Sequence, residues 1–233
     1  MRELWWSGTA IAVCMFSAAS LKAQDTRTTP QQEAARVQRE LRRGNIHGAA
    51  VLNGGTLIRE IYLEPDNAPS DIEMISSQSH AVFVGVPTLT RSTPAFSQVG
   101  TRINTYFRVR ISETLKGPAH SEISLEVPGG RLEFPDGVVA ESRTPGFRVE
   151  PGRRYVFFTI RHLAVGPLEP VPLPAYALVD GFRGAVDLSE PDRKVRTMTR
   201  QPPPYAGEDV DAFLTRLRRL LIRSEGSVDA PGR

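Results

Sequence analysis

The amino-acid sequence predicts a mainly β domain with a short internal helix and an amphipathic C-terminal helix. Three patterns predict this fold class. Apolar and polar side chains alternate along residues 107–112 and 123–127, with the period of two that half-buries a strand. Short uninterrupted apolar runs bounded by turn residues are typical of buried strands. From residue 210 to residue 221, apolar side chains recur at the spacing of one helix face.

The alternating segments predict two strands joined by a turn. Their inward positions are Phe107, Val109 and Ile111 in the first strand and Ile123, Leu125 and Val127 in the second. Lys116-Gly117-Pro118 predicts the connection between them. Further strands are predicted in the apolar runs Ala81–Val86, Tyr155–Ile160, Tyr176–Val179 and Ala185–Leu188. The stretch Thr88–Gly100 is rich in Ser and Thr and contains Pro94, so we expect a polar loop there.

Three local patterns precede the first buried run. Residues 31–43 predict a marginal helix closed by Gly44, with an apolar side formed by Ala34, Val37 and Leu41. Asn53-Gly54-Gly55 separates residues 46–52 from residues 56–63, and because Asn and Gly accept positive φ, we expect a β-hairpin. Ser70 and Glu73 have the spacing of a capping box, which predicts a helix start. In that helix the inward positions are Ile72, Ile75 and Ser76.

The predicted C-terminal helix has a strong apolar stripe. Its members are Val210, Phe213, Leu214, Leu217, Leu220 and Leu221. Acidic residues occupy its first turn and arginines its last, which suits the helix dipole. Pro202-Pro203-Pro204 forbids helix just upstream and predicts a stiff, extended link. The stripe packs on the β domain, docks a partner or lies on an anionic membrane surface, and we favour packing.

The first 23 residues are typical of a secretory signal peptide. A short basic head containing Arg2 precedes an apolar run from Trp5 to Leu21. Ala23 offers a small residue for cleavage, and Ala19 is an alternative. An uncleaved N-terminal anchor is the competing interpretation, because the run is near the shortest length that spans a bilayer. We therefore expect an exported protein of the periplasm or the extracellular space.

Cleavage would remove Cys14, which is the only cysteine, and leave a soluble, cysteine-free chain. The expected order after the signal peptide is a flexible lead with a marginal helix at 24–45, a β domain at 46–190, a Pro-rich link at 191–207, a helix at 208–223 and a disordered tail at 224–233. A chain of this length can bury a core large enough to fold without disulfides. Export without cysteine is typical of a bacterial envelope protein rather than of a small disulfide-stapled domain.

Several segments between residues 46 and 222 resemble a group of uncharacterised exported bacterial proteins. They are SHAVFVGVP, YFRVRISETLKGP, ISLEVPGG, PGFRVEPGRRYVFF, YALVDGFRGAVDL and DVDAFLTRLRRLL. That group is regarded as similar to the netrin and tissue metalloproteinase inhibitor domains. The resemblance therefore implies an OB-like, netrin-like β-barrel with flanking helices. In the inhibitor family, a cysteine at the mature N-terminus chelates the target's zinc, whereas Cys14 here would leave with the signal peptide.

The sequence contains no catalytic signature. None of the four histidines, His47, His80, His120 and His162, lies within three to five residues of another His or of Cys, so a local zinc motif is absent. There is no Gly-x-Ser-x-Gly motif, and the glycine pairs lack the spacing of a phosphate-binding loop. We therefore expect a protein that is not an enzyme, with no catalytic residue, cofactor or metal.

One strand face is a candidate ligand site. Tyr106, Arg108 and Arg110 project to the same side of the first alternating strand. OB-type barrels often bind extended ligands on a sheet face that combines aromatic side chains with positive charge. A solvated strand face with no ligand is the alternative interpretation of the same three residues.

These observations predict an exported, non-enzymatic binding module whose ligand is an envelope protein or an anionic surface polymer. The barrel resemblance implies a second function, regulation or inhibition of an extracytoplasmic protease. A small hydrolase is the third. The net formal charge is only +3, so we do not expect a nucleic-acid partner. After residue 23 the sequence has no run long and apolar enough to span a bilayer.

Overall fold

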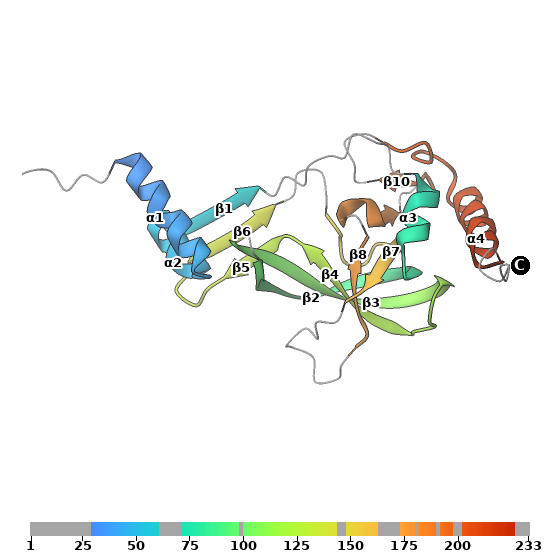
Figure 1. Ribbon diagram of the computed structural model, residues 1–233, viewed down its shortest axis with the longest axis horizontal. Helices are drawn as coiled ribbons and strands as arrows, with labels where there is room; N and C mark the ends of the chain where they lie inside the picture. Colours follow the sequence, from blue (N-terminus) through green and yellow to red (C-terminus); the bar gives the residue numbers. More distant parts are fainter. Residues whose placement is uncertain are drawn as a thin grey trace, which may run out of the picture.

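Five strands close into a β-barrel in the computed structural model, which describes residues 29–60, 71–97, 100–143, 148–162, 173–179, 181–189, 192–197 and 202–226 (Figure 1). The strands are β2 (Ala81–Ser97), β3 (Gly100–Lys116), β4 (Glu122–Pro128), β7 (Tyr155–Arg161) and β8 (Ala175–Leu178). Their order is β7-β2-β3-β4-β8, and β8 pairs with β7 to complete the circle. β4 and β8 run parallel, and the other pairs are antiparallel. The predicted mainly β, OB-like fold class is confirmed.

The barrel strands divide their apolar side chains between two clusters. Phe107 of β3 and Leu125 of β4 lie in the barrel interior with Phe83 of β2, which confirms the predicted alternation. The neighbouring residue Val82 and Phe158 of β7 point outward into a second buried cluster. Where β2 and β7 pair with each other, both of their faces are buried. Their sequences are therefore uninterrupted apolar runs in which apolar and polar residues do not alternate.

Two helices supply the cover of that second cluster. They are α3 (Ile72–Gln78) and α4 (Val210–Gly226), which lie beside each other at one end of the molecule (Figure 1). The predicted stripe of α4 is buried there at Val210, Phe213, Leu214, Leu217 and Leu221, and Leu220 is partly buried. The helix therefore packs on the barrel, and it continues past the predicted end at residue 223. Ile72, Ile75 and Ser76 of α3 are buried as predicted.

The start of α3 differs from the prediction by one residue. The N-cap is Asp71, whose side chain accepts a hydrogen bond from the Glu73 backbone N–H at 3.0 Å. Asp71 has the extended backbone that an N-cap requires, and its carboxylate is a stronger acceptor for an amide at the helix dipole than a hydroxyl. Ser70 lies outside the described residues.

The Pro-rich link contributes to the core where it is described. β9 (Ala185–Asp187), which follows the short 3-10 helix η2 (Gly181–Gly184), pairs with β7 and with β10 (Arg196–Thr197). Tyr205 is buried, with its ring centroid 5.5 Å from that of Phe213 in α4. The described part of the link thus holds α4 against the barrel through side-chain packing, and residues 204–207 form a turn rather than the predicted extended chain.

A small lobe lies at the opposite end of the molecule from α4 (Figure 1). It contains α1 (Pro30–Arg42), α2 (Ile46–Leu52) and a sheet of β1 (Thr56–Glu60), β6 (Val139–Arg143) and β5 (Gly130–Glu133). α1 confirms the helix predicted at 31–43, although Ala34 is exposed and only Val37 and Leu41 are buried. The lobe has its own apolar cluster, which reaches the barrel at Ile103 of β3.

The predicted hairpin at residues 46–63 is wrong. Residues 46–52 form α2, whose N-cap Asn45 accepts a hydrogen bond from the Gly48 N–H at 2.8 Å. Ile46, Ala49 and Ala50 then bury one helical face. β1 pairs in parallel with β6 rather than with residues 46–52. Gly54 and Gly55 do adopt positive φ, but their turn joins a helix to a strand.

The predicted polar loop at 88–100 is also wrong, because residues 88–97 belong to β2 and pair antiparallel with β3, which begins at Gly100. Ser and Thr fit a strand whose outer face is solvated. Pro94 is compatible because β2 pairs with β7 only as far as Gly85, which leaves the far half of β2 at the sheet edge.

The predicted signal peptide and residues 24–28 and 227–233 lie outside the described residues. Among the helices of the described ranges, none has the length and apolar character needed to cross a membrane.

Candidate functional site

The structure brings the predicted ligand face together on the outside of β3. Arg108 and Arg110 are exposed, and Tyr106 is partly buried. On the neighbouring strand β4, Glu126 lies in register with Tyr106 and Glu122 with Arg110. The face therefore carries both signs of charge, which makes it a weaker platform for an anionic ligand than the sequence alone indicates.

A polar cluster lies beside Tyr106, formed with Asn104, Glu126 and His162. The Asn104 side-chain amide donates to one oxygen of Glu126, and the other oxygen lies 3.5 Å from Nδ1 of His162. Burial raises the pKa of the Tyr106 hydroxyl, and the negative charge of Glu126 raises it further. Glu126 Oε2, His162 Nδ1 and Asn104 Oδ1 are buried without a hydrogen-bond partner.

This Glu126 cluster places a carboxylate beside an imidazole, but at 3.5 Å the two groups do not form the hydrogen bond that proton transfer requires. Within the described part of the chain, no group of three or more His, Cys, Asp or Glu side chains could hold a metal ion. His162 is isolated in the sequence from any other candidate site residue. It meets Glu126 only because β8 pairs with both β4 and β7, which joins segments far apart in the chain. No local spacing could have identified the pair.

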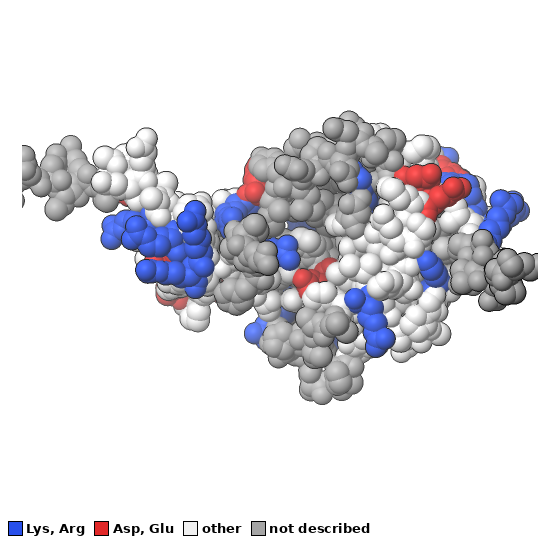
Figure 2. All heavy atoms as spheres, in the orientation of Figure 1, with Lys and Arg blue, Asp and Glu red and all other residues white. Residues whose placement is uncertain are grey.

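A groove between α1 and α2 is a site that sequence reasoning missed. It has a volume of about 530 Å³ and is lined by Arg36, Arg39, Glu40, Arg43, His47, Gly48, Val51 and Leu52. We call it the α1–α2 groove. Figure 2 shows basic side chains gathered over α1, at the end of the molecule that carries the small lobe.

Positive charge in the α1–α2 groove is only partly compensated. The Glu40 carboxylate lies 3.5 Å from Arg43 and accepts a hydrogen bond from Asn45 at 2.7 Å. Arg36 and Arg39 form no ion pair with the described residues. The groove thus offers guanidinium groups to a ligand that brings carboxylates or phosphates.

One end of the α1–α2 groove is held by contacts to the β5–β6 turn. His47 Nε2 lies 2.7 Å from Asp136 Oδ2, and the His47 ring meets Phe134 edge-on at 4.8 Å between centroids. The hydrogen bond with His47 lowers the pKa of Asp136. Apolar side chains complete the wall, since Val51 and Leu52 are 49% and 44% exposed. The groove therefore combines charge with accessible aliphatic surface.

A second groove lies between α3 and α4, with a volume of about 970 Å³. Its charges are mixed, because Glu73 and Asp211 line it together with three arginines of α4. One of these, Arg216, donates to the Glu208 carboxylate at 2.7 Å. This groove is therefore closer to electrical balance than the α1–α2 groove.

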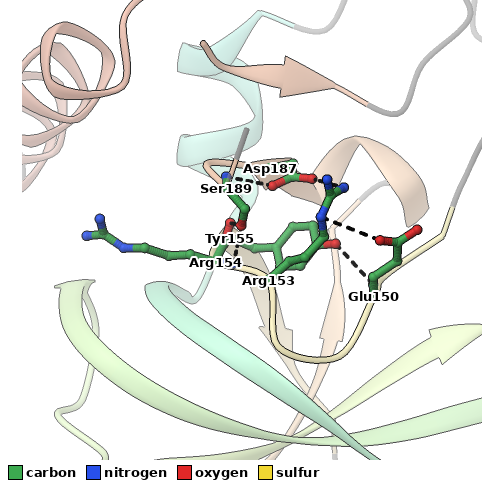
Figure 3. A network of polar contacts seen from close by, with 6 residues as sticks. All are labelled: Glu150, Arg153, Arg154, Tyr155, Asp187 and Ser189. Carbon is green, nitrogen blue, oxygen red and sulfur yellow. Dashed lines mark hydrogen bonds and ion pairs between the residues drawn. The ribbon is translucent and has the colours of Figure 1, made fainter. Parts of the chain in front are cut away.

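A network around Asp187 has a structural role (Figure 3). The buried Asp187 carboxylate accepts from Arg153 at 2.8 Å and from the Ser189 backbone N–H at 2.8 Å. The Tyr155 hydroxyl accepts from the backbone N–H of Glu150, and Arg153 also lies 3.4 Å from the Glu150 carboxylate. These groups form hydrogen bonds and ion pairs with one another, and they fix the turn before β7 to the end of β9. Their bonding capacity is therefore used within the network rather than offered to a ligand.

Comparison with protein family models and with curated proteins finds no match to this chain. The candidate sites therefore rest on their geometry and charge.

Proposed function

We propose that this chain is an exported, non-enzymatic binding module of the bacterial envelope, and that the α1–α2 groove binds an anionic partner. The observation that supports the proposal is the row of Arg36, Arg39 and Arg43 along one wall of the groove. These residues follow the i, i+3, i+7 spacing of one helix face, so their side chains project from the same side of the helix. Only Glu40 opposes them within the groove lining.

The envelope location is supported by the predicted signal peptide at residues 1–23. The predicted face of Tyr106, Arg108 and Arg110 is a secondary candidate, because Glu122 and Glu126 lie beside it. An anionic partner is attracted more strongly where arginines lack acidic neighbours.

Binding to model polymers tests this proposal. We expect the chain lacking residues 1–23 to bind polyglutamate and polygalacturonate at low salt, to bind polylysine weakly, and to lose affinity as salt screens the arginines. The double variant Arg36→Glu/Arg39→Glu should weaken polyanion binding about tenfold, from the usual strength of exposed ion pairs. Microscale thermophoresis measures the dissociation constants.

Arg42→Glu is the matched control, because Arg42 lies on the same helix but does not line the groove. It should change the affinity less than twofold. The single variant Arg39→Glu changes the net charge by the same amount as Arg42→Glu, so an equal loss in these two variants would show that overall charge, and not the α1–α2 groove, attracts the polymer, and would overturn the proposal.

A further inference from the structure

We infer that the natural occupant of the α1–α2 groove is an acidic amphipathic α-helix of a partner protein, an inference that rests on the proposed function. The arginine row is the first observation. From Arg36 to Arg43 the helix advances about 10 Å, which is two turns. On another helix, carboxylates at positions i, i+3 or i+4, and i+7 span the same length along the helix axis. Each carboxylate can therefore pair with one of the three guanidinium groups.

The aliphatic wall is the second observation. Val51 and Leu52 expose about half of their surface at the C-terminal end of α2, within the same groove. An anionic polysaccharide presents mainly hydroxyl and carboxylate groups, so it would cover these aliphatic side chains less completely than the apolar face of a helix. A helix with an apolar stripe next to its acidic row would bury them, as in the helix-in-groove mode of peptide recognition.

The shape of the site favours a helix over a membrane surface. Peripheral membrane helices insert a convex apolar face into the bilayer with basic residues along its sides. Here the arginines and the aliphatic side chains line a hollow between two helices. A hollow surface excludes a flat bilayer from its floor but accepts a rod-shaped ligand along its length.

Contacts behind the groove fix its width before any ligand binds. Asn45 bonds both to the Gly48 N–H and to the Glu40 carboxylate, and this joins the end of α1 to the start of α2. A Cβ on Gly48 would lie 2.2 Å from the Asn45 side chain, so a larger residue would displace that contact. The groove is thus preorganised, which lowers the entropic cost of binding.

Three designed peptides of one length test the inference. The first places Glu at i, i+4 and i+7 beside a row of Leu on a helix, the second contains the same residues in shuffled order, and the third has Lys in place of Glu. We expect the chain lacking residues 1–23 to bind the first peptide at least tenfold more tightly than either of the others in fluorescence anisotropy. Arg36→Glu/Arg39→Glu should weaken this binding about tenfold, while Arg42→Glu should change it less than twofold.

The variant Val51→Gln/Leu52→Gln separates the two parts of the site. Both side chains are exposed, so we expect the melting temperature to stay unchanged while affinity for the first peptide falls about fivefold. The same variant should bind polyglutamate as well as the unchanged chain does. An unchanged affinity for the first peptide would overturn the helix inference.

Failure of the inference is distinguishable from failure of the proposed function. Equal binding of the ordered and the shuffled acidic peptides, with the same sensitivity to Arg36→Glu/Arg39→Glu, would overturn the helix and leave the anionic partner. Tighter binding to phosphatidylglycerol vesicles than to the first peptide would replace the helix with a membrane surface. Absence of binding to every peptide, vesicle and polyanion would overturn both.

Discussion

At the scale of single residues, burial determines the charge state or the hydrogen-bond partners that a polar side chain must have. Tyr205 lies in the apolar layer beneath α4, and burial raises the pKa of its hydroxyl to about 12. Nearby Arg216 and Arg183 favour the ionised form, but desolvation outweighs them. By contrast, Asp187 is buried as an acceptor of Arg153 and Ser189. A buried polar group is tolerated when it has partners or stays neutral.

We expect stability to fall between about pH 10 and pH 12 because of Tyr205. An unfolded tyrosine ionises near pH 10, whereas the folded one stays neutral up to about pH 12. The raised pKa thus contributes stability below pH 10 that is lost as pH rises, about 2–3 kcal/mol in all. Urea unfolding at several pH values measures this loss of stability. In Tyr205→Phe the loss between pH 10 and pH 12 should be smaller by about 2–3 kcal/mol. Parallel pH dependences of the two proteins would contradict the prediction.

At the scale of elements, α4 is attached to the barrel by apolar contact along its stripe and by a charged contact with β3. Arg218 donates two hydrogen bonds of 2.8 Å to Glu113 of β3, and these bonds lower the pKa of that carboxyl. Both side chains remain partly exposed, so solvent weakens the pair. The apolar stripe is buried and therefore holds most of the attachment energy of α4.

Leu217→Ala in α4 should destabilise the protein by about 2–5 kcal/mol, because Leu217 is fully buried and its removal leaves a cavity. Ile222→Ala on the same helix should cost under about 0.5 kcal/mol, since Ile222 is 70% exposed. Urea denaturation of the two variants measures the difference. A similar small loss in both would indicate that α4 is free to leave the barrel and dock elsewhere.

At the scale of the whole molecule, the small lobe and the barrel have separate apolar clusters. The contacts that join them include Ile103 and a hydrogen bond of 2.8 Å from the Thr101 hydroxyl to the Leu41 carbonyl. The groove therefore lies on a unit that is smaller than the barrel and less deeply packed. Regions that carry binding sites are often drawn from the less stable parts of a fold.

Hydrogen exchange followed by mass spectrometry should reveal this division. We expect peptides from residues 30–60 and 130–143 to exchange faster than those from residues 81–86 and 155–159, whose side chains lie in the barrel clusters. The anionic partner should slow exchange in residues 36–52 without changing the barrel. Uniform protection across all four segments would show that the lobe and the barrel open as one unit.

The sequence predicts well those helices and strands that bury one side against the core, because burial of one side produces a regular pattern of apolar residues. The alternation of Phe107 and Val109 and the stripe from Val210 to Leu221 each record which side of one element meets the core. The same local rules failed at residues 46–63 and 88–100. A turn at Asn53-Gly54-Gly55 suits either a hairpin or a helix-to-strand connection, and Ser and Thr suit either a loop or a solvated strand.

By itself, then, the sequence determined the mainly β class, the buried segments of the barrel strands and the buried face of α4, because hydrophobic periodicity is a local property. Only the tertiary structure decided the closure of β7 on β8, the parallel pairing of β1 with β6, and the meeting of Glu126 with His162. The α1–α2 groove belongs to the same group. Its arginines are visible in the sequence, but the way in which two helices pack to line a groove with Arg36, Arg39 and Arg43 is encoded by no local pattern.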